Sequence, residues 1–185
     1  ERYLKLDDMF LSNDQFQFIT QIDGEERWMQ DYCLDMALKV LTYDKSCAAS
    51  GIAIASTFES QIFFAPDQTG KEEYRSLFAG KNWIFIPIND GMDETLNTGV
   101  FGAHWSLLAL NRVKKVAHYM DSMFVNDDEH HDIACAVSRG MMAVLGDNGD
   151  DWVLKIETNS PHQQRNNLCK PDWSGACGPF VYTMI

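Results

Sequence analysis

The chain has 185 residues, 45% of them hydrophobic, and carries a formal net charge of -12 at pH 7. A chain of this size can bury a substantial core, so we expect one domain over residues 1–185. The acidity argues against anionic partners such as nucleic acid or a membrane surface, and no apolar run reaches the roughly 20 residues of a membrane span. An acidic surface suits a basic partner surface, unless it serves only solubility.

Cysteine usage and the first residues bear on the compartment. The five cysteines are an odd number, and they do not stand at the short spacings of zinc ligands. The chain starts Glu1-Arg2-Tyr3, which does not resemble a signal peptide. We therefore expect a reduced, intracellular protein that is cytoplasmic or nuclear. We also expect it to be monomeric and to use no metal or other cofactor.

One long helix is the clearest element expected in the first half. Asp23, followed three residues later by Glu26, resembles a capping box, and apolar residues then recur at near-helical spacing. This pattern predicts a helix over residues 25–42. The other expectations are a short helix at residues 7–11, a helix or buried strand over 46–58, an extended segment at 61–64 and a helix at 71–78.

The second half carries stronger patterns. Residues 83–88 are rich in β-formers, and Pro87 among them indicates an edge or an irregularity in the pairing. A glycine-rich stretch over residues 89–102 predicts a long loop of the kind that often covers a binding site. An apolar stripe with Gly146 behind it predicts a helix over 127–145. We further expect a strand at 152–157 and a polar loop over 159–176.

Two strands between these elements bring a histidine and a carboxylate together. We expect residues 104–110 and 115–121 to form two strands, with residues 111–114 between them. If those four residues form the loop, His104 stands directly opposite Asp121. Opposed residues of an antiparallel pair point to the same face, with Cβ atoms about 4.5–5.5 Å apart. The sequence thus predicts a His104–Asp121 contact.

Cys177 is the candidate nucleophile. It is followed by Gly178, Pro179 and apolar residues, which predicts that a helix begins at the cysteine. The free N–H groups and positive dipole end of such a helix favour a thiolate. A thiolate, an imidazole, a carboxylate that orients the imidazole and a donor to the oxyanion are the groups that a cysteine protease needs. Gln164 supplies an amide for that last role, with Gln163 as the alternative.

Several runs in combination resemble one family of cysteine proteases. They are Gly102-Ala103-His104-Trp105-Ser106-Leu107-Leu108, His118-Tyr119-Met120-Asp121-Ser122, Gln164-Arg165-Asn166 and Cys177-Gly178. Together they resemble the ubiquitin-like-protein protease (Ulp/sentrin-specific) family. Two further runs, Ile86-Pro87-Ile88-Asn89-Asp90 and Arg27-Trp28-Met29-Gln30-Asp31, resemble its deneddylase branch. The resemblance implies an α+β, papain-like fold: a central mixed or antiparallel sheet flanked by helices, with the nucleophile at a helix N-terminus.

The resemblance also implies a role for particular residues in cleavage after the C-terminal Gly-Gly of a ubiquitin-like modifier, Nedd-type in preference to SUMO. Cys177 would be the nucleophile, His104 the general base and acid, and Asp121 the group that orients His104. Gln164 would join the backbone N–H of Cys177 in the oxyanion hole.

The remaining implied residues would bind the modifier's tail. Trp28 and Trp105 match aromatic residues that roof a narrow tunnel for the glycines, through which only residues without a Cβ pass easily. Asp31 matches an acid near the basic tail residue. The loop from Asp90 to Gly102 matches a segment that closes over the tail, and Asn89, directly before this loop, would also contact the substrate.

Two departures from the family pattern motivate an alternative function. Ala176 stands where the family usually has an aspartate, and Gln164 lies thirteen residues before Cys177 rather than the usual six. The alternative is therefore a catalytically inactive module that binds the modifier. An acetyltransferase with a similar histidine, acid and cysteine is less favoured, because we find no basic cluster for coenzyme A.

Other histidines and cysteines receive structural interpretations. The pair His130-His131 is expected on a solvated helix face rather than in a metal site, because no cysteine pair stands near it. A disulfide between Cys169 and Cys177, which would silence the nucleophile, is a less favoured alternative to a free thiol.

Overall fold

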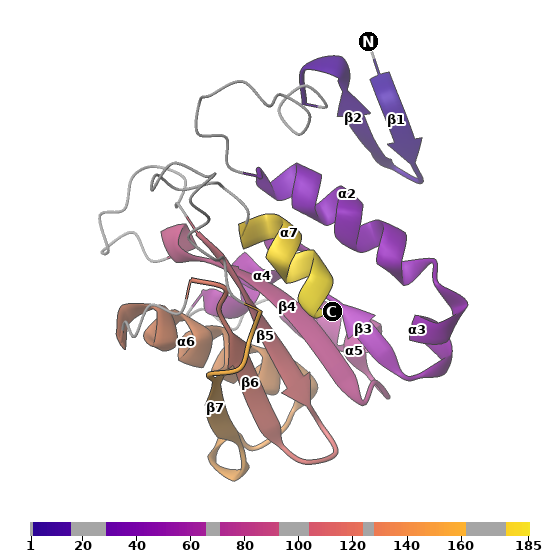
Figure 1. Cartoon of the computed structure of the whole chain (residues 1–185). Coiled ribbons are helices and arrows are strands. Elements are labelled where there is room, and N and C mark those ends of the chain that lie inside the picture. Colours follow the sequence, from indigo (N-terminus) through magenta and orange to yellow (C-terminus); the bar gives the residue numbers. More distant parts are fainter. Residues whose placement is uncertain (1, 16–28, 66–70, 93–103, 124–127, 162–176) are drawn as a thin grey trace.

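A central sheet with helices on both faces dominates the computed structural model, which describes residues 2–15, 29–65, 71–92, 104–123, 128–161 and 177–185 (Figure 1). The sheet has five strands in the order β3-β4-β5-β6-β7. In chain order they are β3 (Ile52–Ile54), β4 (Trp83–Asn89), β5 (Trp105–Asn111), β6 (Val116–Met120) and β7 (Val153–Glu157). The outer pairs β3–β4 and β6–β7 are parallel and the inner pairs antiparallel, so the sheet is mixed, as predicted.

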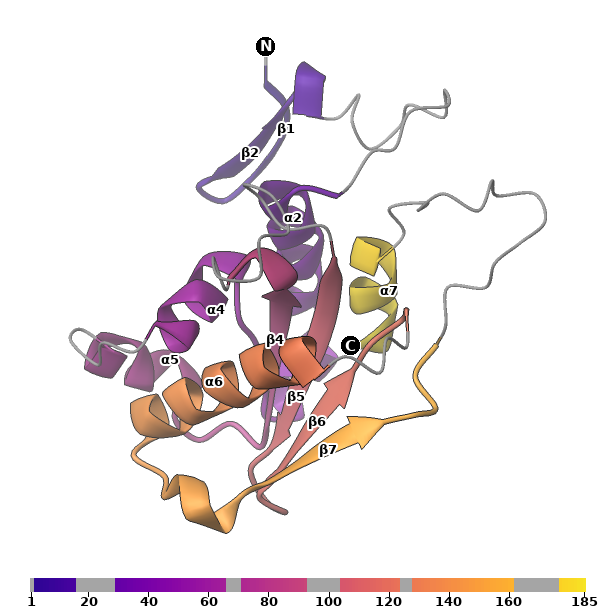
Figure 2. The same cartoon turned by 90° about the vertical axis from the view of Figure 1, so that its left-hand side faces the viewer.

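The two faces of the sheet are covered by different helices (Figure 2). On one side lie α4 (Thr57–Phe64), α5 (Arg75–Phe78) and α6 (Asp128–Leu145), and on the other α2 (Asp31–Thr42) and α7 (Cys177–Met184). A separate antiparallel hairpin stands at the N-terminal end. The remaining elements are β1 (Arg2–Leu6), β2 (Met9–Ser12), α3 (Lys45–Ala49), η1 (Lys71–Tyr74), η2 (Asp90–Met92) and η4 (Gly149–Asp151).

The larger core lies between the sheet and α4 and α6. Its fully buried side chains come from alternating strand positions and from one stripe of α6, as the periodicities of strand and helix require. Helices α4 and α6 approach closely at Gly140, where an added Cβ would overlap the carbonyl oxygen of Phe63. This core fixes one face of the sheet, and helices α2 and α7 pack on the other face.

A smaller core lies on the opposite face, under α2 and α7. Its buried members are Leu34, Leu38, Trp105, Leu107, Cys177 and Val181. The first turn of α7 fits closely against the segment before α2, because a Cβ on Gly178 would lie 2.6 Å from the sulfur of Met29. The position of the cysteine therefore depends on this second core.

Several expectations for the first half were wrong. Residues 7–11 belong to the β1–β2 hairpin, whose turn holds Asp7 at a φ of 53°, rather than to a helix. Residues 61–64, expected to be extended, end helix α4. The missed signal is a capping box, in which the Ser56 hydroxyl accepts from the Glu59 N–H at 3.1 Å and the Glu59 carboxylate accepts from the Ser56 N–H at 2.6 Å.

The long first helix is confirmed with a later start. It begins at Asp31 rather than at residue 25, and the expected capping box of Asp23 and Glu26 lies outside the described residues. The ambiguous stretch 46–58 contains parts of α3 and α4, with β3 between them, and residues 71–78 are helical as expected.

The second half agrees more closely with expectation. Helix α6 and strands β4 and β7 lie within one or two residues of the predicted ranges. Strand β3 pairs with β4 only as far as Phe85, so at Pro87 the ladder continues on the β5 side alone. A proline is tolerated there because it withdraws no N–H from a second neighbour. Most of the predicted loops over 89–102 and 159–176 lie outside the described residues.

Candidate active site

His104 directly precedes β5, and its backbone N–H and carbonyl are held by the last residue of β4 and the first residue of η2. The His104 N–H donates to Oδ1 of Asp90 at 2.9 Å, and the Asp90 N–H donates to the His104 carbonyl at 3.2 Å. The Asn89 side-chain amide donates to the same carbonyl at 3.3 Å. The structure therefore places Asn89 and Asp90, which we predicted to contact substrate, on the backbone of the predicted base.

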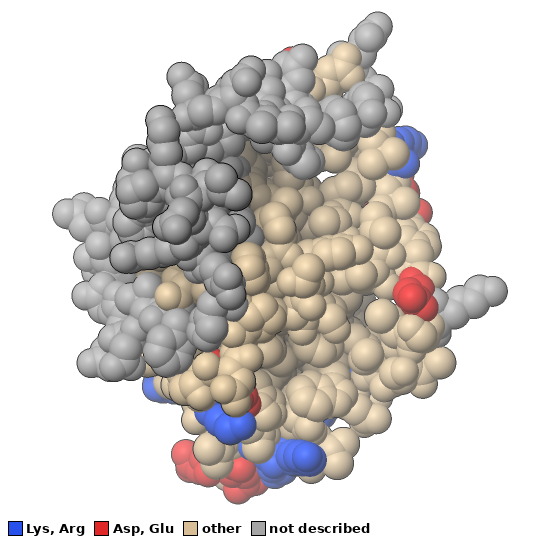
Figure 3. All heavy atoms as spheres, viewed as in Figure 1, with Lys and Arg blue, Asp and Glu red and all other residues tan. Residues whose placement is uncertain are grey.

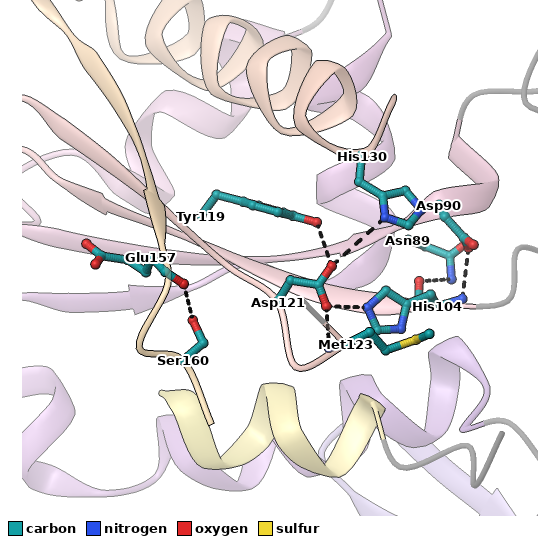
Figure 4. Close-up of polar contacts among 9 residues, drawn as sticks. All are labelled: Asn89, Asp90, His104, Tyr119, Asp121, Met123, His130, Glu157 and Ser160. Carbon is teal, nitrogen blue, oxygen red and sulfur yellow. Dashed lines mark hydrogen bonds and ion pairs between the residues drawn. The ribbon is translucent and has the colours of Figure 1, made fainter. Parts of the chain in front are cut away.

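The His104 ring forms the predicted contact with Asp121. Its Nε2 lies 2.7 Å from Oδ1 of Asp121, and the two side chains are only 5% and 6% exposed (Figure 4). The Met123 N–H donates to the same oxygen at 2.7 Å, and the Tyr119 hydroxyl donates to Oδ2 at 3.3 Å. These bonds fix the carboxylate in the orientation that meets the ring.

The strand register differs from the predicted one by two residues. Leu107 pairs with Met120 and Asn111 with Val116, so the loop is residues 112–115. Asp121 consequently approaches His104 diagonally rather than from directly opposite. The contact survives because side chains alternate with a period of two, and an even shift keeps both on the same face.

Burial and hydrogen bonding act in opposite directions on the two groups. Burial alone lowers the pKa of His104, but interactions with Asp121 and with Cys177 outweigh it and raise the pKa to about 9. Burial likewise raises the pKa of Asp121, while the hydrogen bond from His104 and the N–H of Met123 bring it below its usual range. At neutral pH the pair is therefore an imidazolium and a carboxylate.

Cys177 is the first residue of α7, as predicted, and its side chain is a fully buried free thiol. The ring nitrogen of His104 that faces away from Asp121, Nδ1, is buried and has no hydrogen-bond partner among the described residues. The cysteine is nevertheless close enough for its interaction with the ring to contribute to the pKa of His104. Catalytic hydrogen bonds are often long before substrate is bound. The arrangement can serve a thiolate–imidazolium pair.

Trp105 anchors the segment in front of α2. Its indole N–H donates to the carbonyl of Met29 at 2.8 Å, and its ring belongs to the same buried cluster as Cys177. Asp31, at the start of α2, has an exposed side chain whose Oδ1 accepts from the N–H of Tyr32 at 2.8 Å. Trp105 thus lies beside the cysteine, and Asp31 presents a carboxylate to solvent.

Other predicted site residues lie outside the described residues. They are Trp28, Gly102, Gln163, Gln164, Cys169 and Ala176. The roles of Trp28 in the tunnel, Gly102 in the covering segment and Gln164 or Gln163 in the oxyanion hole remain predictions.

The expectation of a solvated helix face at His130-His131 was wrong for His130. Its side chain is 14% exposed, and its ring stacks on that of His104 with centroids 5.9 Å apart. A signal was available, because His130 stands three residues before Ile133 and so continues the buried stripe of α6 by one turn.

Neither a metal-binding cluster nor a membrane-spanning helix is found in the part of the chain that the structure describes. No cluster of three or more histidine, cysteine or acidic side chains there could hold a metal ion. None of the helices there has the length and apolar character to cross a bilayer.

Comparison with known proteins adds independent information. The family model described as "Ulp1 protease family, C-terminal catalytic domain" matches residues 27–185. No curated protein matches the chain in sequence.

Three solved structures illustrate the structural likeness. The Ulp1 protease domain in complex with Smt3, the yeast ortholog of SUMO, has a TM-score of 0.71 at 19% identity, covering 98% of this chain and 73% of that one. The Xanthomonas campestris effector XopD bound to ubiquitin has a TM-score of 0.55 at 20% identity, covering 90% and 79%. The Chaetomium thermophilum Ulp1-like SUMO protease catalytic domain has 0.58 at 14%, covering 95% and 66%.

At these identities the structures show a shared fold, and the family model covers most of the chain. The chain belongs to the Ulp1 protease family of cysteine proteases.

Proposed function

We propose that the chain is a thiol isopeptidase and processing protease that cleaves after the C-terminal Gly-Gly of a ubiquitin-like modifier. The observation that carries the proposal is the buried His104–Asp121 pair beside Cys177 at the head of α7. Family membership supports it, as do similar structures whose bound partners are a SUMO ortholog and ubiquitin.

The residues act in a fixed sequence in this proposal. The Cys177 thiolate attacks the carbonyl carbon of the terminal glycine, and the oxyanion that forms is held by the Cys177 N–H and by Gln164 or Gln163. The imidazolium of His104 gives its proton to the leaving lysine amine as the C–N bond breaks, which leaves a thioester. His104 then takes a proton from water as the water oxygen bonds to the thioester carbonyl carbon. The C–S bond breaks, which releases the modifier with a free carboxyl group and regenerates the thiolate.

Asp121 has a separate part in this mechanism. Its carboxylate accepts from His104 Nε2, so it keeps Nδ1 turned toward the sulfur and stabilises the imidazolium. A buried carboxylate can do this effectively because the surrounding medium screens its charge poorly.

A Nedd-type modifier is the preferred substrate in our proposal. The support is the deneddylase-like run Ile86–Asp90 and the exposed carboxylate of Asp31, which suits a basic residue in the modifier's tail. The net charge of -12 favours such a tail generally. SUMO and ubiquitin are the competing substrates.

The experiment that tests the function uses modifiers with an electrophile in place of the C-terminal carboxylate. Nedd-type, SUMO and ubiquitin probes are each incubated with the protein, and mass spectrometry locates the adduct. We expect capture at Cys177, fastest with the Nedd-type probe, loss of capture in Cys177→Ala, and retention in the control Cys135→Ala, whose cysteine lies on α6. Reversible binding without any adduct would support the inactive module, and fastest capture by SUMO would overturn the Nedd-type preference.

A further inference from the structure

The two carboxylate oxygens of Asp121 accept different numbers of hydrogen bonds. Oδ1 accepts from His104 Nε2 and from the Met123 N–H, both at 2.7 Å. Oδ2 accepts from the Tyr119 hydroxyl at 3.3 Å, which is long for a bond between oxygens. Because the carboxylate is only 6% exposed, water does little to complete the shell of Oδ2.

His130, on helix α6, faces Oδ2, the Asp121 oxygen that accepts only the one long hydrogen bond from Tyr119 among the described residues. Its Nδ1 lies 3.9 Å from Oδ2 of Asp121, and Figure 4 shows its ring above His104, turned toward the carboxylate. This Nδ1 is buried and has no hydrogen-bond partner among the residues that the structure describes. A buried nitrogen without a partner is costly, and an approach of roughly 1 Å would bring the two atoms to hydrogen-bond distance.

The His130 ring is also held against the ring of the predicted base. The two rings stack at 28° with centroids 5.9 Å apart. His130 thus lies against both members of the pair. It is a minor cause of the lowered pKa of Asp121, after His104 and the Met123 N–H, while burial acts in the opposite direction. Packing alone would not require a nitrogen to point at the carboxylate.

We propose that His130 is a positioning residue for the cysteine-protease reaction: its Nδ1–H donates to Oδ2 of Asp121 and holds the carboxylate turned toward His104. The inference rests on the proposed function for its catalytic consequence. The hydrogen bond itself does not depend on that function.

Two replacements of His130 separate a donor from a packing role. His130→Phe keeps a ring that can stack on His104 but has no donor. His130→Asn loses the ring but places an amide N–H near the position of Nδ1. A donor role predicts that kcat/KM falls about tenfold in the Phe variant, mainly through kcat, and about threefold or less in the Asn variant. A packing role predicts the reverse order.

The control is His131→Phe on the same helix. His131 lies edge-on to Tyr119, with ring centroids 5.5 Å apart, and phenylalanine keeps that contact. We expect kcat/KM within about twofold of the unchanged protein. Thermal unfolding of each variant shows whether any loss merely reflects a smaller folded fraction.

A spectroscopic measurement makes the inference independent of activity. The proton of His104 Nε2 in its 2.7 Å bond to Asp121 should give a downfield proton NMR signal. We expect this signal in the unchanged protein and in His130→Asn, and its weakening or upfield movement in His130→Phe. If the Phe variant keeps both signal and rate, the inference is overturned. If the unchanged protein cleaves no modifier, the proposed function fails, and the signal alone decides the role of His130.

Discussion

Two histidine–carboxylate pairs at the same sheet have similar nitrogen–oxygen distances but differ in burial and in their neighbouring groups. His104 Nε2 lies 2.7 Å from Asp121 Oδ1, and His118 Nδ1 lies 2.6 Å from Glu157 Oε1. The first pair is 5% and 6% exposed, whereas both side chains of the second are 22% exposed. The histidine of the first pair also interacts with the thiol of Cys177, which helps to raise its pKa.

The second pair is part of an open face of the sheet. Glu157 also accepts from Lys155 Nζ at 2.7 and 2.9 Å, and Lys155 is the larger cause of its lowered pKa, ahead of His118. The His118 ring lies beside Trp83, at the edge of a shallow hollow of about 330 Å³. The described part of this face is mostly uncharged, with most of its charged side chains along the lower edge (Figure 3).

The comparison shows that a short histidine–carboxylate contact does not by itself mark a catalytic group. Lys155 shares the carboxylate of Glu157, and solvent reaches it, so the electrostatic interaction of Glu157 with His118 is weaker. Burial lets Asp121 act more strongly on His104, and no lysine shares the Asp121 carboxylate among the described residues. Mutations at equivalent members of the two pairs test this difference.

The largest expected effect is at the two histidines. His104→Ala should lower kcat/KM by about 10²- to 10⁴-fold, because it removes the proposed general acid and base. His118→Ala should leave the rate within about twofold. Steady-state cleavage of a modifier fusion measures both, and equal losses at the two positions would remove the distinction that we draw.

The two carboxylates should differ next. Asp121→Asn should lower kcat/KM by about 10²-fold or more, because the amide no longer stabilises the imidazolium or selects its tautomer. The same change should lower the pKa of His104, since burial would then dominate. The alkaline limb of the rate profile should move to lower pH in Asp121→Asn and stay in place in Glu157→Gln. An unmoved limb in both would exclude control by Asp121.

The pH dependence of the unchanged protein is the third test. With the pKa of His104 at about 9, kcat/KM should fall as the pH rises through about 9, when the leaving amine loses its proton donor. Because this pKa is raised above the unfolded value of 6.5, the stabilising contribution of His104 is complete below pH 6.5 and is lost as the pH rises through about 9.

Urea unfolding between pH 6 and 10 measures the second effect. His104→Ala should remove the part of the decline in unfolding free energy that His104 causes, while His118→Ala should leave it in place. A decline of the same size in His104→Ala would assign it to other groups.

The smallest effect is expected for the open pair. Glu157→Gln should lower the unfolding free energy by about 1 kcal/mol or less at pH 7, as partly exposed ion pairs usually do. The pKa of Glu157 is lowered from 4.5, so its contribution is present above that value and is lost as the pH falls through the lowered pKa. The difference between the two proteins should therefore vanish in acid. A loss of several kcal/mol would mean that this pair is structurally as important as the buried one.

Much of the fold in the second half could be predicted from local patterns. Helix α6 and strand β7 follow from an apolar stripe and from β-rich composition, and α7 follows from a glycine and a proline directly after Cys177. The first half was predicted less well, because a short segment such as 7–11, which has two aspartates and three apolar residues, fits a strand or a helix equally until its partner strand is known.

The site divides in a similar way. The order of His104, Asp121 and Cys177 along the chain, and the face that the first two share, follow from motifs and from the period of a strand. The register was wrong by two residues, since it depends on where a four-residue turn closes. His130 was missed, because its burial depends on how α6 lies across the sheet.

The sequence by itself determined which chemical groups are present, in what order, and on which face of each element they stand, because side-chain periodicity is a local property of helices and strands. Only the tertiary structure decided that His104 is buried beside the sulfur while His118 remains near solvent, and that a second imidazole approaches Asp121. Those outcomes depend on packing between elements far apart in the chain, where burial sets how strongly one charge acts on another.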